Sequence, residues 1–433
     1  MEREIIGLIG LGLMLGLLVL RVHIGIALIS VSFAGIYYLI GPRPALGMLS
    51  TLPYDFSASW TLSSVPMFLL MGFVAFHTGM TGGLFAAAKV LLARLPGGLA
   101  ISSIFACSAF ASVSGSSVAT AAAMGRIAIP EMVKAGYRPS IAAGSIAAGG
   151  TIGALIPPSI LMIIYGIIAE TSVTQVFVGG LTIGILTALS YAIVILVISL
   201  TRPDVIPARA ELDPGEGGRI LVKILPVGAL VVLVFGGLFS GYFTATEAGA
   251  VGALGTVVLA AITGKLTRHA ISRSLIETVT TTGSLLIIGI GATMFTRFLG
   301  LSGLQGFIAQ AVAGADLGYL GLMLIIVVIY LILGTFMEPF GAMLVTLPVF
   351  LPVLEAQGVS LVWFGVLVVK LLEIGMITPP VGLNVFVIRN VAAAHVTTAQ
   401  IFKGVIPFLV ADLVVVALVI AVPAIVLFLP GLL

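Results

Sequence analysis

The stretch Gly153–Met162, GALIPPSILM, lies in a long apolar segment and places two prolines side by side where a helix would otherwise continue. Proline lacks the backbone N–H donor, and its ring clashes with the preceding helical turn. The same arrangement returns at Gly375–Asn384, GMITPPVGLN. Within a bilayer, such a break is tolerated only where protein or a water-filled cavity satisfies the freed backbone groups. The two stretches therefore predict two discontinuous helices at a buried site.

Composition identifies the broad class of the protein. Of the 433 residues, 60% are hydrophobic and 8% are charged, and the mean hydropathy is +1.29. A soluble protein would carry roughly 25% charged residues. Many apolar stretches are long enough to cross about 30 Å of hydrocarbon. The predicted fold class is an all-α polytopic membrane protein. No run of basic residues interleaved with aromatics is present, which argues against a nucleic-acid-binding surface.

Apolar segments mark the expected helices. Segments expected to be single spans lie at 5–20, 24–40, 65–88, 179–200, 220–240, 246–263, 277–298 and 405–428, and the segments that contain the paired prolines lie at 138–168 and 360–391. Two further segments, 99–128 and 319–352, are too long for one span and have polar or glycine-rich middles, Ser112–Thr120 and Leu333–Met343. Each of these two is expected to form a re-entrant hairpin of two half-helices.

Loop charge predicts the orientation. Lysine and arginine gather near 89–94, 126–138, 202–223 and 265–273, and such loops tend to face the cytoplasm. The turns at Glu170–Thr174 and Val353–Ser360 contain neither residue type and are expected outside. With this assignment the first hairpin opens inward, the second opens outward, and both termini lie outside. Arg3 and Arg43 are minor exceptions.

The two halves of the chain match each other. Pro130 and Pro157 are separated by the same 27 positions as Pro352 and Pro379. In the expected topology an odd number of crossings separates equivalent points, so the second copy is inverted relative to the first. Inverted repeats with discontinuous helices are typical of secondary transporters, whose sites lie near the membrane midplane. One duplicated and inverted unit thus explains why the same break occurs twice.

The repeat divides the chain into four parts. We expect scaffold helices in 1–64, and a first repeat in 65–200 with hairpin 99–128 and broken helix 138–168. We expect a linker loop and further scaffold helices in 201–276. The second repeat occupies 277–433, with hairpin 319–352 and broken helix 360–391.

Helix breaks supply groups that bind ions. An interrupted helix exposes unpaired carbonyls on the half that ends and free N–H groups on the half that begins. Carbonyl oxygens suit a hard cation such as sodium, and N–H groups suit a carboxylate. Two sodium sites are therefore expected, each closed by a hairpin tip, from Ser112, Gly115, Ser116, Gly153 and Ile156 in the first copy, and from Gly334, Thr335, Gly375 and Thr378 in the second. Close helix packing is an alternative reason for these small residues.

Further residues at or near the breaks are candidates for substrate contacts: Ser117, Thr151, Pro157, Pro379 and Asn384. The amide of Asn384 has an alternative role in a helix–helix hydrogen bond. Charges within apolar spans are functional candidates, and they comprise Arg297, Glu338, Lys370, Glu373 and Asp412. Glu338 and Glu373 are placed to tune ion affinity. Arg297, and likewise a further arginine, Arg389, have a simple alternative role in snorkelling to an interface.

An enzyme is not expected. The four histidines are scattered without metal-ligand spacing, and no P-loop motif for ATP is present. The protein is expected to use an ion gradient and to need no cofactor.

Four motifs carry a resemblance to a known family: Ser114–Tyr137 (SGSSVATAAAMGRIAIPEMVKAGY), Gly153–Ser159 (GALIPPS), Phe243–Leu254 (FTATEAGAVGAL) and Ile377–Val387 (ITPPVGLNVFV). With these, the chain resembles the large membrane subunit of tripartite ATP-independent periplasmic (TRAP) transporters over nearly its whole length. The resemblance implies a multi-pass protein of the bacterial inner membrane with ion sites at the hairpin tips and breaks. It also implies sodium-coupled uptake of organic acids, such as C4-dicarboxylates or sugar acids, by an elevator mechanism.

The resemblance also implies partners. These are a small four-helix membrane subunit and a periplasmic binding protein that delivers the substrate. The chain starts near its first span, so the small subunit is expected to be a separate polypeptide. Ile156 stands where the second copy has Thr378, so the first ion site must depend more on backbone carbonyls or on Ser112 and Ser116. Two alternatives remain: an ion-coupled carrier that works without a binding protein, and a channel or scaffold without coupled transport.

Overall fold

The computed structural model describes residues 2–92, 94–207, 220–315 and 318–432, and in these ranges the secondary structure is entirely helical. The α-helices, in chain order, are α1 (Arg3–Val19), α2 (Ile24–Ile40), α3 (Pro42–Ser57), α4 (Ser64–His77), α5 (Thr81–Leu92), α6 (Gly98–Ser114), α7 (Ser117–Lys134), α8 (Pro139–Thr151), α9 (Ile160–Ile168), α10 (Val173–Thr201), α11 (Ile220–Phe239), α12 (Ala245–Ile262), α13 (Arg268–Leu301), α14 (Leu304–Gly314), α15 (Gly318–Phe336), α16 (Pro339–Ala356), α17 (Leu361–Gly375), α18 (Leu383–Val391), α19 (Thr398–Ala421) and α20 (Ala424–Leu427).

Several helices are long and apolar enough to cross a membrane. Among the described residues there are six of these, namely α10, α12, α13, α15, α16 and α19. The pair Pro42–Ser57 and Thr61–His77, bent by 58°, makes a seventh if it is one span. The predicted class, an all-helical membrane protein with several spans, is therefore confirmed.

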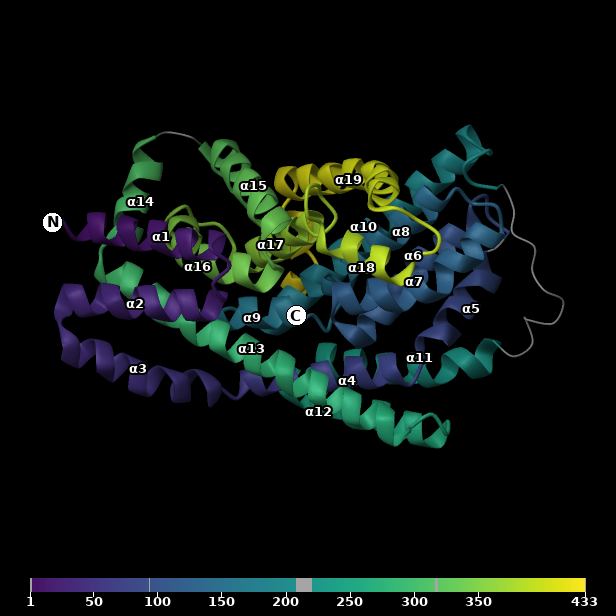
Figure 1. The fold of residues 1–433 in the computed structure, drawn as a ribbon, viewed down its shortest axis with the longest axis horizontal. Helices are drawn as coiled ribbons and strands as arrows, with labels where there is room; N and C mark the ends of the chain where they lie inside the picture. Colours follow the sequence, from purple (N-terminus) through teal and green to yellow (C-terminus); the bar gives the residue numbers. More distant parts are fainter. Residues whose placement is uncertain (1, 93, 208–219, 316–317, 433) are drawn as a thin grey trace.

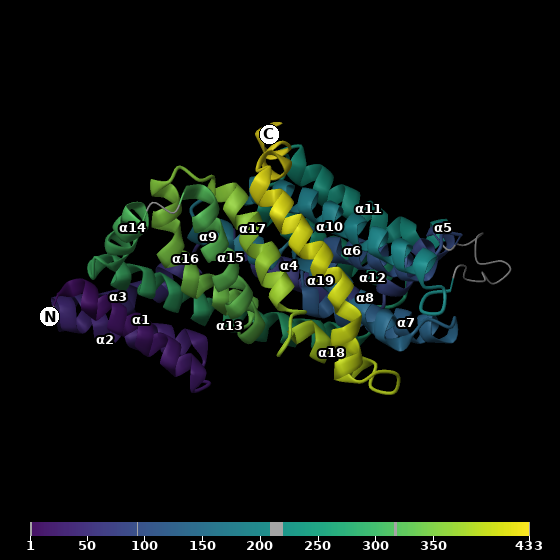
Figure 2. The same cartoon turned by 90° about the horizontal axis from the view of Figure 1, so that it is seen from above.

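The first helices and α13 form one side of the molecule. The long α13 packs against α2, α3 and α4, and α4 packs against α12. Figure 1 shows α1, α2 and α3 together at the end that carries the N-terminus, and Figure 2 shows the same grouping from above. The linker loop expected within 201–276 lies in part, at 208–219, outside the described residues.

The segment predicted as the first hairpin consists of α6 and α7, which pack against each other. The chain reverses at Gly115, whose φ of +60° is the left-handed conformation that glycine adopts most readily. Ser116 then caps α7, because its Oγ accepts the N–H of Ala119 at 3.4 Å. The segment predicted as the second hairpin consists of α15 and α16. It turns at Met337 and Glu338, and the Glu338 side chain caps α16.

Both predicted helix breaks are confirmed. In the first, α8 ends at Thr151 and α9 begins at Ile160, after Pro157 and Pro158. In the second, α17 ends at Gly375, and α18 begins after Gly382, which has a φ of +60°. The Pro157–Pro158 and Pro379–Pro380 peptide bonds are both cis.

The two halves of the chain exchange their second half-helices. Helix α9 of the first break packs against α16 and α17 of the second half. Conversely, α18 of the second break packs against α7 and α8 of the first half. The Tyr165 hydroxyl reinforces the first exchange by donating to the Leu361 carbonyl at 2.6 Å. Each of these half-helices thus packs against the opposite copy, and α9 packs also against α4 and α10 of its own half. Both breaks therefore lie at the centre of the fold.

Three sequence expectations about helices were wrong. The single span at 65–88 is two helices, because Gly79 adopts a φ of +65° between α4 and α5. Helices α3 and α14 were not predicted. In the case of α3, polar residues and an internal proline, Pro53, obscured the helix. The turn of the second hairpin was expected at Gly334 and Thr335, which instead lie in the last turns of α15. Gly334 permits close packing of α15 against α17.

Candidate functional site

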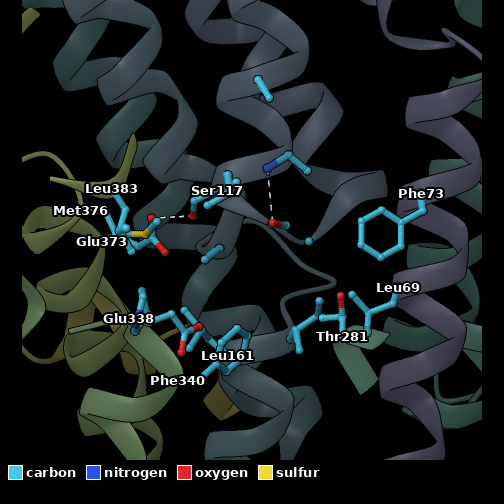
Figure 3. A pocket seen from close by; sticks show the side chains of 18 of the residues that line it. Leu69, Phe73, Ser117, Leu161, Thr281, Glu338, Phe340, Glu373, Met376 and Leu383 are labelled. Atoms are coloured by element: carbon cyan, nitrogen blue, oxygen red, sulfur yellow. Dashed lines mark hydrogen bonds between the residues drawn. The ribbon is translucent and has the colours of Figure 1, made fainter. Parts of the chain in front are cut away.

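A cavity of about 400 Å³ lies between the two hairpin turns and the broken helices. The first hairpin contributes Gly115–Ala119, and the second contributes Glu338–Phe340. The wall is mostly apolar and comes also from α4, α9, α13 and the end of α17, which places Leu69, Phe73, Leu161, Thr281, Glu373 and Met376 around it (Figure 3). A largely apolar pocket with a few converging polar groups is the usual form of a small-molecule site.

The first hairpin tip touches the first helix break through backbone atoms. A Cβ added at Gly153 would lie 2.8 Å from the Ser116 carbonyl oxygen, and one added at Gly115 would collide with the Pro158 carbonyl oxygen. The glycines therefore bring a helix that ends and a hairpin that turns into direct contact. Ser112 lies in the last turn of α6, where its hydroxyl donates to the Ala109 carbonyl at 2.7 Å.

The side chain of Ile156 does not take part in the contact between the first hairpin tip and the first break. A Cβ added at Gly184 of α10 would lie 2.7 Å from Ile156 Cγ1, which places the Ile156 side chain against α10. Only backbone groups of Ile156 remain available to a site at the break.

The second hairpin touches the second break through the last turns of α15, just before its own turn. A Cβ added at Gly375 would lie 2.6 Å from the Gly334 carbonyl oxygen. The hydroxyls of Thr335 and Thr378 each donate to a carbonyl of their own helix, Thr335 to Leu331 and Thr378 to Ile374, both at 2.7 Å. Because each proton is committed, the hydroxyl oxygens keep lone pairs with which to coordinate a cation.

The predicted substrate residues separate into two groups. Ser117 lines the cavity, whereas Thr151, Pro157, Pro379 and Asn384 are not among its lining residues. Asn384 is fully buried, and its amide nitrogen donates to the Ala147 carbonyl at 3.4 Å, which links α18 to α8. Its Oδ1 has no hydrogen-bond partner among the described residues. The expected helix–helix contact of Asn384 is therefore present.

A carboxylate from the second half meets the tip of the first hairpin in this cavity. The Ser117 hydroxyl donates to Glu373 Oε2 at 2.5 Å (Figure 3). Glu373 is 1% exposed, and its Oε1 has no hydrogen-bond partner among the described residues. The bond joins the two halves of the site at the first turn of α7.

Replacing Ser117 by alanine is expected to destabilise the protein by about 1–3 kcal/mol, because the buried carboxylate of Glu373 loses its hydrogen bond. Ser108→Ala is the matched control, since the Ser108 hydroxyl bonds only within α6, to the Ile104 carbonyl. Denaturant unfolding of the purified protein in mixed micelles measures both. Equal stability of the two variants would contradict the role given to Ser117.

A second polar cluster lies between α17, α19 and α10. Lys370 of α17 donates to Asp412 Oδ1 of α19 at 2.5 Å and to the Thr187 hydroxyl of α10 at 3.1 Å. Tyr191 of α10 donates to both Asp412 oxygens, at 2.8 and 2.7 Å, and lies 3.3 Å from the Thr151 hydroxyl at the end of α8. Lys370 and Asp412 stood out in the sequence as intramembrane charges. Nothing in the sequence predicted that they pair, or that Tyr191 and Thr187 form hydrogen bonds with them.

Comparison with known proteins gives concordant matches. Residues 11–425 match the family described as "Tripartite ATP-independent periplasmic transporter, DctM component". The chain is 35% identical over 379 residues to the C4-dicarboxylate TRAP transporter large permease protein of Pseudomonas aeruginosa, covering 87% of this chain and 88% of that protein. It is 32% identical over 424 residues to the sialic acid TRAP transporter large permease protein of Vibrio cholerae, covering 96% of this chain and 97% of that protein.

Among solved structures, the YdaH transporter of Alcanivorax borkumensis has a similar fold. The TM-score is 0.62, and the match covers 88% of this chain and 89% of that chain. The two sequences are 15% identical, so the likeness concerns the fold alone.

Proposed function

Because the chain belongs to the DctM component of the tripartite ATP-independent periplasmic transporter family, and is thus a transporter permease and not an enzyme, we propose that it imports organic acids with sodium as coupling ion. Its place is the bacterial inner membrane. The cargo class follows the relatives, one of which carries C4-dicarboxylates and another sialic acid.

Contact between each hairpin and its helix break, made at the tip in the first copy and in the last turns of α15 in the second, carries the proposal of sodium coupling. At both places glycines hold carbonyl oxygens against the end of a helix, at Gly153 with Ser116 and at Gly375 with Gly334. Oxygen ligands of this kind suit a hard cation. We therefore assign the sodium sites to these two contacts, with Ser112, Gly115 and the backbone of Ile156 in the first, and Thr335 and Thr378 in the second.

The packing supports an inverted-repeat elevator. The exchange of α9 and α18 between the halves relates α7, α8 and α9 to α16, α17 and α18. We propose repeats at 65–200 and 277–433, scaffold helices in 1–64 and 201–276, and re-entrant hairpins that open to opposite sides. Both hairpins and both broken helices then move as one unit, because the exchanged half-helices tie them together, and the cavity between the tips travels with them.

Partners follow from the family description. A tripartite system implies two further components, and we propose a small membrane subunit and a periplasmic binding protein that delivers the substrate. On arrival, the cargo carboxylate meets free N–H groups in the first turn of α7, where the helix dipole favours an anion.

Uptake of labelled organic acid into proteoliposomes that contain both membrane subunits tests the function. Uptake is expected only with the binding protein and an inward sodium gradient. Thr378→Ala is expected to raise the sodium concentration at half-maximal rate several-fold, because one oxygen ligand is lost. Thr182→Ala is the control, since the Thr182 hydroxyl also bonds within its own helix but lies on α10, away from both tips.

Each alternative function has its own outcome in this assay. Sodium-dependent uptake that ignores the binding protein would indicate a carrier that works alone. Uptake that ignores both sodium and the binding protein would indicate a channel. An unchanged sodium dependence in Thr378→Ala would remove Thr378 from the second ion site.

A further inference from the structure

The charge of the central cavity does not match a purely anionic cargo. Three carboxylates line it, from Glu277, Glu338 and Glu373, and among the described lining residues there is no lysine, arginine or histidine. Apart from the proposed sodium ions, the charged side chains of the cavity would offer a dicarboxylate only like charge, which disfavours binding.

Two of the three carboxylates already have partners. Glu277 lies 3.1 Å from His77 Nε2. Glu338 caps α16, where its side chain accepts the Gly341 N–H at 3.4 Å and the positive end of the helix dipole favours its charge. Neither needs a ligand to account for its position.

Glu373 has no such compensation. It lies in the last turn of α17, which ends at Gly375, and the negative end of a helix dipole disfavours a carboxylate there. Lys370, one turn earlier, directs its ammonium group to Asp412 and Thr187. Among the described residues, Glu373 has one hydrogen-bond donor, the Ser117 hydroxyl, and its buried Oε1 has no partner. Burial of a charged carboxylate in this state is costly, and a cationic group of a ligand would offset that cost.

We propose that Glu373 binds a cationic group of the cargo, and that the transported acid is therefore a zwitterion with an ammonium or amidinium group near its carboxylate. This inference rests on the proposed function and narrows its substrate class. Ser117 belongs to both parts of the site, since its hydroxyl reaches Glu373 and its N–H lies in the first turn of α7. The cationic and carboxylate ends of the cargo are thus held side by side.

The surroundings of Glu373 favour an N–H donor over a metal ion. A sodium ion requires several oxygen ligands, whereas Met376 and Leu383 lie beside Glu373 in the cavity wall (Figure 3). An ammonium or amidinium group instead donates a directed hydrogen bond to Oε1 and packs its carbon atoms against these apolar side chains. Charge-assisted hydrogen bonds of this kind are among the stronger ones.

Binding to the purified two-subunit membrane complex in sodium-containing buffer tests the inference, with pairs of acids that differ in one group. Succinate is compared with 3-aminopropanoate, and glutarate with 4-aminobutanoate, by ligand-induced thermal stabilisation. The amino acids are expected to bind at least about tenfold more tightly than their dicarboxylate counterparts. Glu373→Gln is expected to abolish this preference. Glu355→Gln, at the exposed end of α16, is expected to retain it.

The sodium midpoint of thermal stabilisation without any acid is measured in parallel, and it shows whether Glu373→Gln is folded. Equal or tighter binding of the dicarboxylates, or a preference that survives in Glu373→Gln, would overturn the inference. A sodium midpoint that shifts in Glu373→Gln would make Glu373 an ion ligand and would overturn it as well. Sodium-driven uptake of organic acids without any preference would leave the proposed function intact, whereas absence of all uptake would defeat both.

Discussion

Replacement of Asp412 by alanine is expected to lower the free energy of unfolding by about 3–5 kcal/mol, the usual cost of breaking a buried ion pair on one side. Asp412 is 0% exposed and Lys370 is 1% exposed, and their charged atoms lie 2.5 Å apart. Without Asp412 the ammonium group keeps, among the described residues, one hydrogen-bond partner, the Thr187 hydroxyl, and its position over the Tyr191 ring. Tyr191 also loses the acceptor that receives its hydroxyl proton.

Denaturant unfolding in mixed micelles measures this effect against two references. Asp204→Ala breaks an exposed pair with Arg138, 3.2 Å apart with side chains 57% and 69% exposed, and is expected to cost less than about 1 kcal/mol. The double variant Lys370→Met/Asp412→Leu is expected to recover most of the loss, because apolar groups of similar volume often replace a buried pair without penalty. A cost for Asp412→Ala as small as that for Asp204→Ala would contradict the assigned energetics.

Replacement of Gly375 by alanine is expected to reduce sodium-driven uptake tenfold or more. The added Cβ would lie 2.6 Å from the Gly334 carbonyl oxygen, and since the obstacle is backbone, α15 and α17 must separate. Overpacking of this kind costs about 1–3 kcal/mol, and each 1.4 kcal/mol is a factor of ten in affinity. The loss is expected as weaker sodium binding, because we propose the second ion site at this contact.

Initial uptake rates over a range of sodium concentrations measure the effect of Gly375→Ala. Gly283→Ala is the matched control, because a Cβ at this position of α13 would meet nothing within 4 Å. Uptake by Gly375→Ala with the sodium midpoint of the parent protein would refute an ion site between α15 and α17.

The helix breaks were the part of the site that could be predicted from the sequence. Paired prolines at 157–158 and 379–380 disrupt a helix through local chemistry alone, so their effect is independent of the rest of the fold. The hairpins were predicted for a similar reason, since polar tips interrupt runs that are too long for one span. The turn of the second hairpin was misplaced, because Gly334 is needed for its contact with Gly375 and not for the turn.

What the sequence by itself determined is therefore local: membrane helices from hydropathy, breaks from proline, and which charges lie within apolar segments. Only the tertiary structure decided which helices and which polar side chains come into contact. Glu373 and Ser117 are 256 positions apart, and Lys370 finds its partner on α19 rather than on its own helix. The first of these pairs joins α7 to α17, and the second joins α17 to α19. Hydropathy is a property of single segments, whereas a hydrogen bond or ion pair requires two segments to be placed within about 3 Å of each other.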